Sequence, residues 1–311
     1  MRRLAAFLPA LAVLPALADT VTLKDGSVLK GRITRQDKEA LQILTPDRGP
    51  YPVPAAQVKA VEKGSSVWDR YDKEAAKSPD TPEGHLDLGR WCLKQGLPWQ
   101  AEEEMAKAGS AEELGKLREA RAVGLVLTAA YPGDTDKAFL ASFGERAKEA
   151  SRFMWELTEG QMYVRQITVA DKGGKGDFKG KPDFTIVNLD QIRAKPGEYY
   201  AITRNGTIEA PGKILAYTFF HELMHLKFEM DHCLDCKECI MSSEPTADRL
   251  CDDADHRGKR DGASPSGAVV EGSCWGRIRK LVKDRPLRPL LRDPKRPPGP
   301  PPETRVLVLD H

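Results

Sequence analysis

The residues best suited to chemistry lie in one short segment, which reads His221-Glu222-Leu223-Met224-His225. Positions four apart share one face of a helix, so His221 and His225 can present their imidazoles to a single metal ion. Neutral imidazoles hold Zn²⁺ without cancelling its charge, and an open ligand position keeps a water molecule whose pKa falls towards about 7. Glu222 can take the proton from that water as it attacks a polarised carbonyl. The spacing therefore predicts a hydrolytic zinc site with Glu222 as its base.

The residues that precede this segment argue against an ordinary surface helix with exposed histidines. Residues 214–220 read Ile-Leu-Ala-Tyr-Thr-Phe-Phe, which is too apolar for a helix that faces solvent on one side. The two imidazoles are therefore expected on a largely buried element, where polar groups need partners. A metal ion and a neighbouring carboxylate supply such partners. We expect this helix to run from Lys213 to about Phe228.

The chain after His225 resembles the metzincin family of zinc peptidases. In that family a third ligand follows the second histidine, and a methionine turn lies beneath the metal; residues 239–242, Cys-Ile-Met-Ser, resemble that turn in its adamalysin branch. Residues 155–169 are similar to the metzincin-type domains of calcium-activated chloride channel regulators, and His232-Cys233 with Met241 resembles the archaemetzincin order. The resemblance covers about half of the chain. It implies a zincin-like α+β domain that hydrolyses peptide bonds, with a structural role for Met241.

The third zinc ligand has two candidates, Asp231 at the common metzincin spacing and His232 at the spacing of the chloride-channel-regulator type. We favour His232, because imidazole is the more frequent zinc ligand, and the neighbour would then accept a hydrogen bond from a ligand histidine. The glycine that normally reverses the chain is replaced by Phe228, or by Glu229 in the variant spacing. A residue with a Cβ adopts a positive φ only at a steric cost, so we expect Phe228 and Glu229 to avoid it and the turn to be made in another way.

Five of the six cysteines lie in the last quarter of the chain, and Cys92 stands alone upstream as a buried small apolar residue. The five are Cys233, Cys236, Cys239, Cys251 and Cys274. Outside the cytosol disulfides are the default, so we expect disulfides here. The other interpretation is a second, structural zinc site made by the first three of them with Cys251.

Composition and the N-terminus indicate an exported soluble protein. Residues 1–18 contain two arginines, an apolar run and a closing Ala-Leu-Ala, which is typical of a secretory signal peptide cleaved before Asp19. The chain has 48 basic and 46 acidic side chains among 311 residues and 40% apolar residues. This composition excludes disorder throughout, and it gives no general reason to expect nucleic acid as a partner. No later segment is apolar enough to cross a membrane.

Hydrophobic periodicity divides the mature chain into four parts around the predicted site. Residues 19–64 alternate as four or five short strands and resemble a small SH3-like or Sm-like β-barrel. Residues 65–125 show the spacing of one tetratricopeptide-like helical hairpin. Residues 126–285 combine a helix at about 136–157, strands at 161–169 and 184–187, and the His-Glu helix, so the fold class is α+β with a zincin-like catalytic domain. Residues 286–311 hold 8 of the 23 prolines and are expected to form no packed element.

Three functions are compatible with these patterns. The leading hypothesis is a secreted or periplasmic zinc metallopeptidase, with His221, His225 and His232 on zinc and a peptide or protein as substrate. The first alternative is a zinc-holding envelope scaffold without proteolytic activity, in which Glu222 would have no function as a base. The second is a module that cleaves only its own chain. From Arg277 to Arg296 there are nine basic residues against two acidic ones, so an anionic envelope polymer is a further candidate partner.

Overall fold

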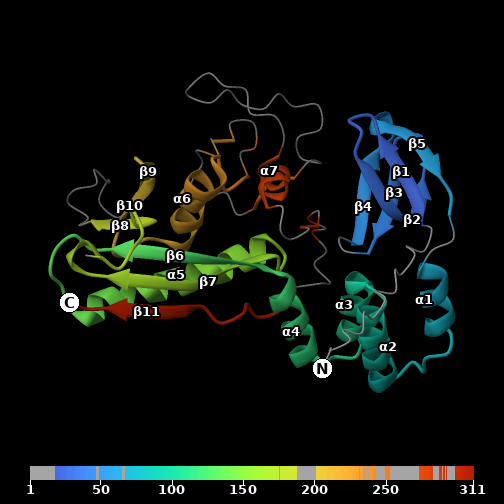
Figure 1. Ribbon diagram of the computed structural model, residues 1–311, viewed down its shortest axis with the longest axis horizontal. Coiled ribbons are helices and arrows are strands. Elements are labelled where there is room, and N and C mark those ends of the chain that lie inside the picture. The colour runs from blue at the N-terminus through green and yellow to red at the C-terminus, as the bar shows by residue number, and fades with distance from the viewer. Residues whose placement is uncertain are drawn as a thin grey trace, which may run out of the picture. The chain divides into compact units, whose positions relative to one another are not determined.

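The computed structural model describes residues 18–46, 49–64, 67–174, 176–187, 201–230, 232–233, 236, 238–242, 249–252, 273–282, 287–288, 290, 292 and 298–311. The chain forms two compact units, Met1–Ala108 and Gly109–His311 (Figure 1). Both units combine helices with a sheet, which confirms the α+β class. The predicted signal peptide lies outside the described residues, Ala18 excepted.

The first unit begins with a five-stranded antiparallel sheet in the order β4-β3-β2-β1-β5. Its strands are β1 (Asp19–Leu23), β2 (Val28–Gln36), β3 (Ala40–Thr45), β4 (Gly49–Pro54) and β5 (Val58–Glu62), with the short helix η1 (Ala55–Gln57) before the last. The period-2 alternation places Val21, Leu41 and Ile43 in one small core. The predicted strands are therefore confirmed. No ladder joins the outer strands β4 and β5 in the described residues, so closure into a barrel stays a prediction.

Three helices complete the first unit: α1 (Val67–Ala75), α2 (Pro82–Lys94) and α3 (Pro98–Lys107). Thr81 begins α2 because its side chain accepts a hydrogen bond from the Gly84 amide at 3.1 Å, and Pro82 follows at the first helical position. Gly89 allows α2 and α3 to approach closely, since a Cβ there would lie 3.0 Å from the Met105 side chain. Cys92 is fully buried, as expected for a small apolar residue. The predicted helical hairpin corresponds to α2 and α3.

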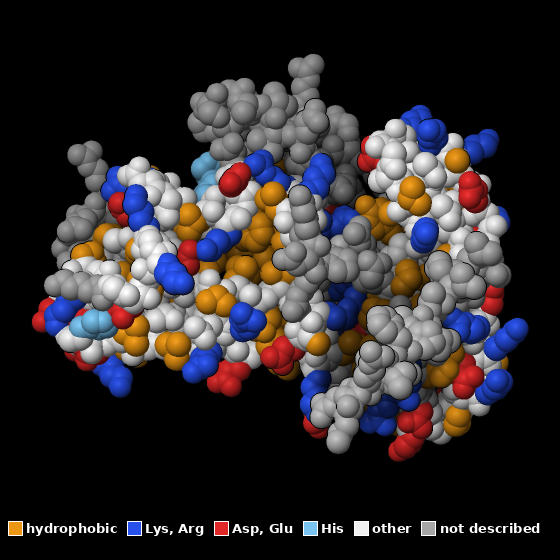
Figure 2. All heavy atoms as spheres, viewed as in Figure 1, with side chains coloured by type: hydrophobic (Ala, Val, Ile, Leu, Met, Phe, Trp, Pro, Cys, Tyr) orange, Lys and Arg blue, Asp and Glu red, His pale blue; other side chains and the backbone are white. Residues whose placement is uncertain are grey.

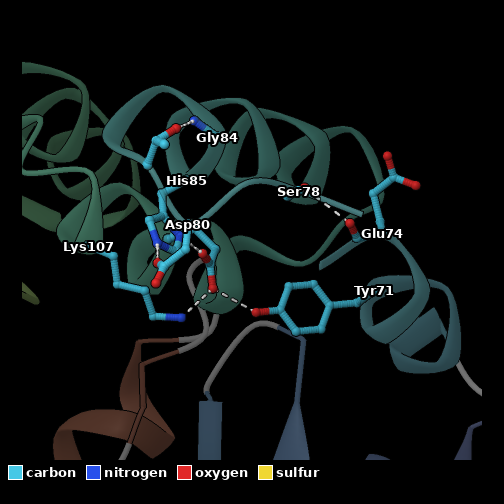
Figure 3. A network of polar contacts seen from close by, with 9 residues as sticks. Tyr71, Glu74, Ser78, Asp80, Gly84, His85 and Lys107 are labelled. Carbon is cyan, nitrogen blue, oxygen red and sulfur yellow. Dashed lines mark hydrogen bonds and ion pairs between the residues drawn. The ribbon is translucent and has the colours of Figure 1, made fainter. Parts of the chain in front are cut away.

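A buried carboxylate ties these three helices together (Figure 3). Glu104 on α3 accepts hydrogen bonds from Tyr71 on α1 and from Lys107, both at 2.7 Å, and lies 2.6 Å from Nδ1 of His85 on α2. The other ring nitrogen of His85 lies 2.8 Å from Asp80. Glu104 first and then Asp80 raise the pKa of His85 above its ordinary value. The imidazolium form of His85 therefore stabilises this part of the unit.

The second unit is built on a six-stranded mixed sheet in the order β11-β7-β6-β8-β10-β9. Its strands are β6 (Val123–Ala130), β7 (Met162–Ala170), β8 (Phe184–Val187), β9 (Ile202–Arg204), β10 (Thr207–Pro211) and β11 (Arg305–Leu309). Neighbouring strands are parallel except at β9, which is antiparallel to β10 and forms one edge of the sheet. Sequence analysis predicted β7 and β8. It missed β6, because Val123–Ala130 is an aliphatic run with a single polar residue, so it lacks the alternation that marks a strand.

The tail contains a strand, so the expectation that residues 286–311 form no packed element is wrong for its last part. β11 pairs in parallel with β7 over five residues, from Arg305 opposite Gln166 to Leu309 opposite Ala170. Prolines precede this strand without entering it, and Val306 and Val308 pack against the core. The side chain of Val306 fills the space beside Gly144, where an added Cβ would lie 2.3 Å away. Residues 305–309 include an aliphatic run that favours a strand. The prediction gave more weight to the number of prolines in the tail and so missed this strand.

In the described part of the second unit, four helices accompany this sheet: α4 (Ala111–Arg121), α5 (Lys137–Leu157), α6 (Ala216–Phe228) and α7 (Cys274–Leu281), with the short turn η2 (Lys172–Gly174) after β7. α5 packs on β7 and β11, and α6 packs on α5 and against β9 and β10. Aromatic rings hold α6 in place, because Phe219 on α6 stacks on Phe184 of β8 at 4.3 Å between centroids, and Phe143 of α5 meets Phe184 edge-on at 5.8 Å. The His-Glu helix is thus anchored to the sheet core.

Charged side chains of both signs are mixed over the visible face (Figure 2), in keeping with the nearly equal numbers of basic and acidic residues. Among the described residues no helix has the length and apolar character that crossing a membrane would require.

Candidate metal centres

The first candidate centre consists of three histidines, two on α6 and one after it. His221 and His225 are one helical turn apart, and their Nε2 atoms approach to 3.1 Å. The ring of His232 lies 5.2 Å from that of His221 and 4.8 Å from that of His225, measured between centroids. One ring nitrogen from each histidine falls within 4.8 Å of the others, which is a group that could hold a metal ion. Asp231, the alternative third ligand, lies outside the described residues.

The chain reverses after α6 through a left-handed residue. Glu229 has φ 49° and ψ 39°, and the Met230 amide bonds back to the Met224 carbonyl at 3.3 Å. The expectation that the turn avoids positive φ at these positions is therefore wrong. The residue in the variant glycine position adopts the conformation of a glycine despite its Cβ, and this turn brings His232 back to the helix.

Hydrogen bonds to the backbone determine which ring nitrogens are available. Nδ1 of His221 lies 2.6 Å from the Ile240 carbonyl oxygen, and Nδ1 of His225 bonds the Met230 carbonyl oxygen. A carbonyl oxygen only accepts, so both Nδ1 atoms carry the proton, and in the neutral rings both Nε2 atoms present lone pairs. In these tautomers Nε2 is the nitrogen that can bind a metal ion.

The short distance between the Nε2 atoms of His221 and His225 fits a cation between them. Two lone pairs 3.1 Å apart repel each other unless a proton or a metal ion lies between. Burial lowers the pKa of His221, so a proton is the less favoured occupant. Two nitrogens bound at about 2.05 Å to a tetrahedral zinc ion would lie about 3.3 Å apart. The donor set, the tautomers and the spacing agree with zinc.

Glu222 lies beside the three histidines and outside their group of candidate ligands. It is buried, with 7% of its surface exposed, and the Thr203 hydroxyl on β9 donates to its Oε2 at 2.6 Å. Sequence analysis predicted Glu222 but not Thr203. No sequence signal marks a lone threonine on a three-residue strand, and only the sheet topology brings it to the helix.

The second candidate centre is a group of four buried thiols, from Cys233, Cys239, Cys251 and Cys274, whose Sγ atoms all lie within 4.8 Å of one another. Sγ of Cys239 is 3.6 Å from that of Cys274, and Sγ of Cys233 is 4.0 Å from that of Cys251. A disulfide needs about 2.05 Å. Two sulfurs bound at about 2.3 Å to tetrahedral zinc would lie about 3.8 Å apart. The four thiols are therefore spaced so that they could hold a metal ion such as zinc.

This geometry corrects the expectation of disulfides, since none of the six cysteines is joined to another by a disulfide in the structure. It also corrects the membership of the alternative zinc site, in which Cys274 takes the place of Cys236. Cys274 begins α7, where its amide donates to Sγ of Cys251 at 3.2 Å. The sequence did not reveal this member, because a distant helix supplies it.

The two candidate centres share one segment of backbone. His232 of the first centre precedes Cys233 of the second, and Ile240, whose carbonyl bonds His221, follows Cys239. The Cys233 amide donates to the Met241 carbonyl at 2.7 Å. Met241 itself is fully buried, in keeping with a packing role. A change in the four-thiol group can therefore reach the histidines at two places. One is the peptide link between Cys233 and His232, and the other is the hydrogen bond between His221 and Ile240, the residue after Cys239.

Comparison with known proteins adds no family to this picture. No protein-family model matches the chain, and no curated protein or solved structure gives a match.

Proposed function

We propose that this chain is a zinc metallopeptidase of the metzincin type, with His221, His225 and His232 as zinc ligands and Glu222 as the base. The observation that best supports this proposal is the group of three imidazoles. Nδ1 of His221 and of His225 is hydrogen-bonded to a backbone carbonyl, and the buried carboxylate of Glu222 lies next to His221 in the chain. A purely structural site has no use for that carboxylate, because burying a carboxylate is costly.

Each residue has a defined task in this proposal. A zinc ion held here would polarise both a water molecule and the carbonyl of the peptide bond to be cut. Nδ1–H of His221 and of His225 fix the rings on the Ile240 and Met230 carbonyls, so that the Nε2 atoms are aimed before the metal arrives. Glu222 takes the proton of the attacking water and passes it to the departing amine. Its burial excludes bulk water that would compete for the carboxylate.

The edge strand β9 is the proposed support for the substrate. It is the last strand of the sheet and pairs with β10 alone among the described strands. Thr203 on β9 touches Glu222, so the unpaired edge runs past the proposed base. An extended peptide can add to such an edge through backbone hydrogen bonds, which hold many sequences in one orientation. This arrangement favours peptides as the substrate class.

We also propose that the four-thiol group holds a second, structural zinc ion. Hydrogen-bonded contact with the other thiols, Cys233 first, raises the pKa of Cys251, so a bound cation would be needed to draw this thiol into its thiolate form. The bound ion would fix Cys233 and Cys239, which adjoin His232 and the Ile240 carbonyl that bonds His221. Export remains part of the proposal, and β1 begins at Asp19, so that cleavage of residues 1–18 would leave the first sheet intact.

The test uses residues 19–311, purified and assayed on a broad peptide library with and without a chelator. The parent should hydrolyse peptides, and a chelator should stop it. Glu222→Gln should keep its zinc and its thermal stability while hydrolysis falls by about 10²–10⁴-fold, the usual effect of losing a general base. Glu229→Gln is the matched control, because it makes the same change at an exposed position on the end of the same helix. Zinc binding without chelator-sensitive hydrolysis would instead identify a silent scaffold, and cleavage of the chain alone would identify a self-processing module.

A further inference from the structure

Thr203 is the residue through which the sheet reaches the proposed base. It is the middle residue of β9 and lies opposite Ile208 of β10 in the ladder. Its hydroxyl oxygen is 2.6 Å from Oε2 of Glu222 and 3.2 Å from the Glu222 backbone carbonyl. Glu222 is on α6, so this contact joins the edge of the sheet to the helix that holds the histidines.

The two distances show where the single hydroxyl proton goes. A hydroxyl that donates to a carboxylate makes a charge-assisted bond, which is shorter and stronger than a bond to a neutral carbonyl. The 2.6 Å contact with Oε2 is therefore the hydrogen bond, and the carbonyl contact is secondary. Among the described residues, Oε1 of Glu222 has no protein partner. Thr203 thus donates a hydrogen bond to Oε2 and leaves Oε1 to accept the proton from the attacking water.

We propose that Thr203 is a positioning residue for Glu222. Through its hydroxyl, the edge strand β9, which would hold a peptide, also sets the orientation of the base. The inference rests on the proposed function and adds a residue to it. A glutamate side chain has three rotatable bonds, and a base must be held within about 0.5 Å of its working position. The short, ladder-held strand β9 provides a fixed point for that purpose, since Thr203 is β-branched and stiff at χ1.

The coupling predicts a specific kinetic pattern. Thr203 touches the base, whereas the peptide would bind through the backbone of β9, which the Thr203 side chain does not alter. Loss of the hydroxyl should therefore lower kcat and leave KM nearly unchanged. Thr203 contacts none of the three histidines in the hydrogen bonds of the described residues, so zinc content should also stay the same.

Three variants of the full mature chain test this. Thr203→Val keeps the size and the β-branch but removes the hydroxyl, and Thr203→Ser restores it. Thr185→Val is the matched control, because it removes a hydroxyl from β8 that bonds Thr207 at 3.1 Å and does not touch Glu222. The measurements are kcat and KM on peptides from the library, zinc per chain, and crystal structures of the zinc-loaded parent and Thr203→Val.

We expect kcat of Thr203→Val to fall about 10- to 100-fold and KM to stay within about twofold of the parent. Displacing a catalytic group by about 1 Å can lower the rate by up to about 10²-fold. Thr203→Ser and Thr185→Val should remain near the parent. The crystal structure of Thr203→Val should show the Glu222 carboxylate displaced. A Thr203→Val variant with the parent kcat, or one whose carboxylate has not moved, overturns the inference. A parent without hydrolysis refutes the proposed function instead, and the two crystal structures then decide alone whether Thr203 sets the position of Glu222.

Discussion

Replacing Glu229 by glycine should stabilise the protein, although glycine usually weakens a helix end. Glu229 closes α6 with φ 49°, in the left-handed region that a Cβ makes unfavourable. Its side chain is exposed and makes no ion pair or hydrogen bond in the described part of the chain. Its carbonyl accepts a hydrogen bond from Arg277 at 2.5 Å, which a glycine would retain. The substitution therefore removes strain and no side-chain contact.

The magnitude follows from two opposing terms. A left-handed conformation costs a residue with a Cβ about 1–2 kcal/mol, and glycine avoids that cost. Glycine also loses about 0.5–1 kcal/mol more backbone entropy on folding. The net gain is about 0.5–1 kcal/mol. For a unit of about 200 residues this raises Tm by roughly 1–4 °C.

The assay is thermal and denaturant unfolding of the parent and of two variants under identical metal loading. Glu229→Ala is the matched control, because it removes the same side chain but keeps the Cβ, and it should show no gain. A Glu229→Gly variant no more stable than Glu229→Ala would refute the reasoning, since the left-handed turn would then carry no strain.

Three further predictions concern metals and pH. Cys274→Ser should reduce zinc from two ions per chain to one or none, whereas Cys236→Ser should leave both, as measured by elemental analysis; equal losses would disprove the four-thiol assignment. His232→Ala should weaken zinc binding at the histidine centre far more than Asp231→Ala, because a lost ligand costs more than the roughly 10–100-fold typical of an outer partner; the reverse order would exchange their roles. Because the folded-state pKa of His85 is raised, its contribution to stability is complete below about pH 6.5 and is lost as pH rises through the folded pKa. His85→Gln should abolish that fall in a series of denaturant midpoints from about pH 6 to about pH 9, and an unchanged pH profile would show that the network does not act through this imidazole.

Residues with a strong local pattern could be predicted from the sequence. The His-Glu helix was predictable because the four-residue spacing of its histidines and its apolar flank are local features, and α6 ends at Phe228 as expected. The strands β7 and β8 were recognisable from their own residues. The grouping of His221, His225 and His232 needed only one short turn, so the sequence carried most of the first candidate centre.

Features that depend on distant parts of the chain could not be predicted in the same way. Cys274 joins Cys239 from a segment 35 residues away, and nothing in the spacing of the cysteines favours that partner over Cys236. Thr203 reaches Glu222 only because β9 runs antiparallel at the end of an otherwise parallel sheet. The expectation of disulfides came from the compartment rather than from geometry. Each of these features is a property of the folded topology.

The pairing of β11 with β7 has a consequence for the order of events during synthesis. Gln166 of β7 faces Arg305, a residue 139 positions later in the chain. A chain made from its N-terminus exposes the outer edge of β7 until residues 305–309 leave the ribosome, and closing so long a loop is slow. The second unit therefore completes its sheet only after residues 305–309 have been made. Until then, the outer edge of β7 keeps unpaired backbone groups that another extended chain could bind.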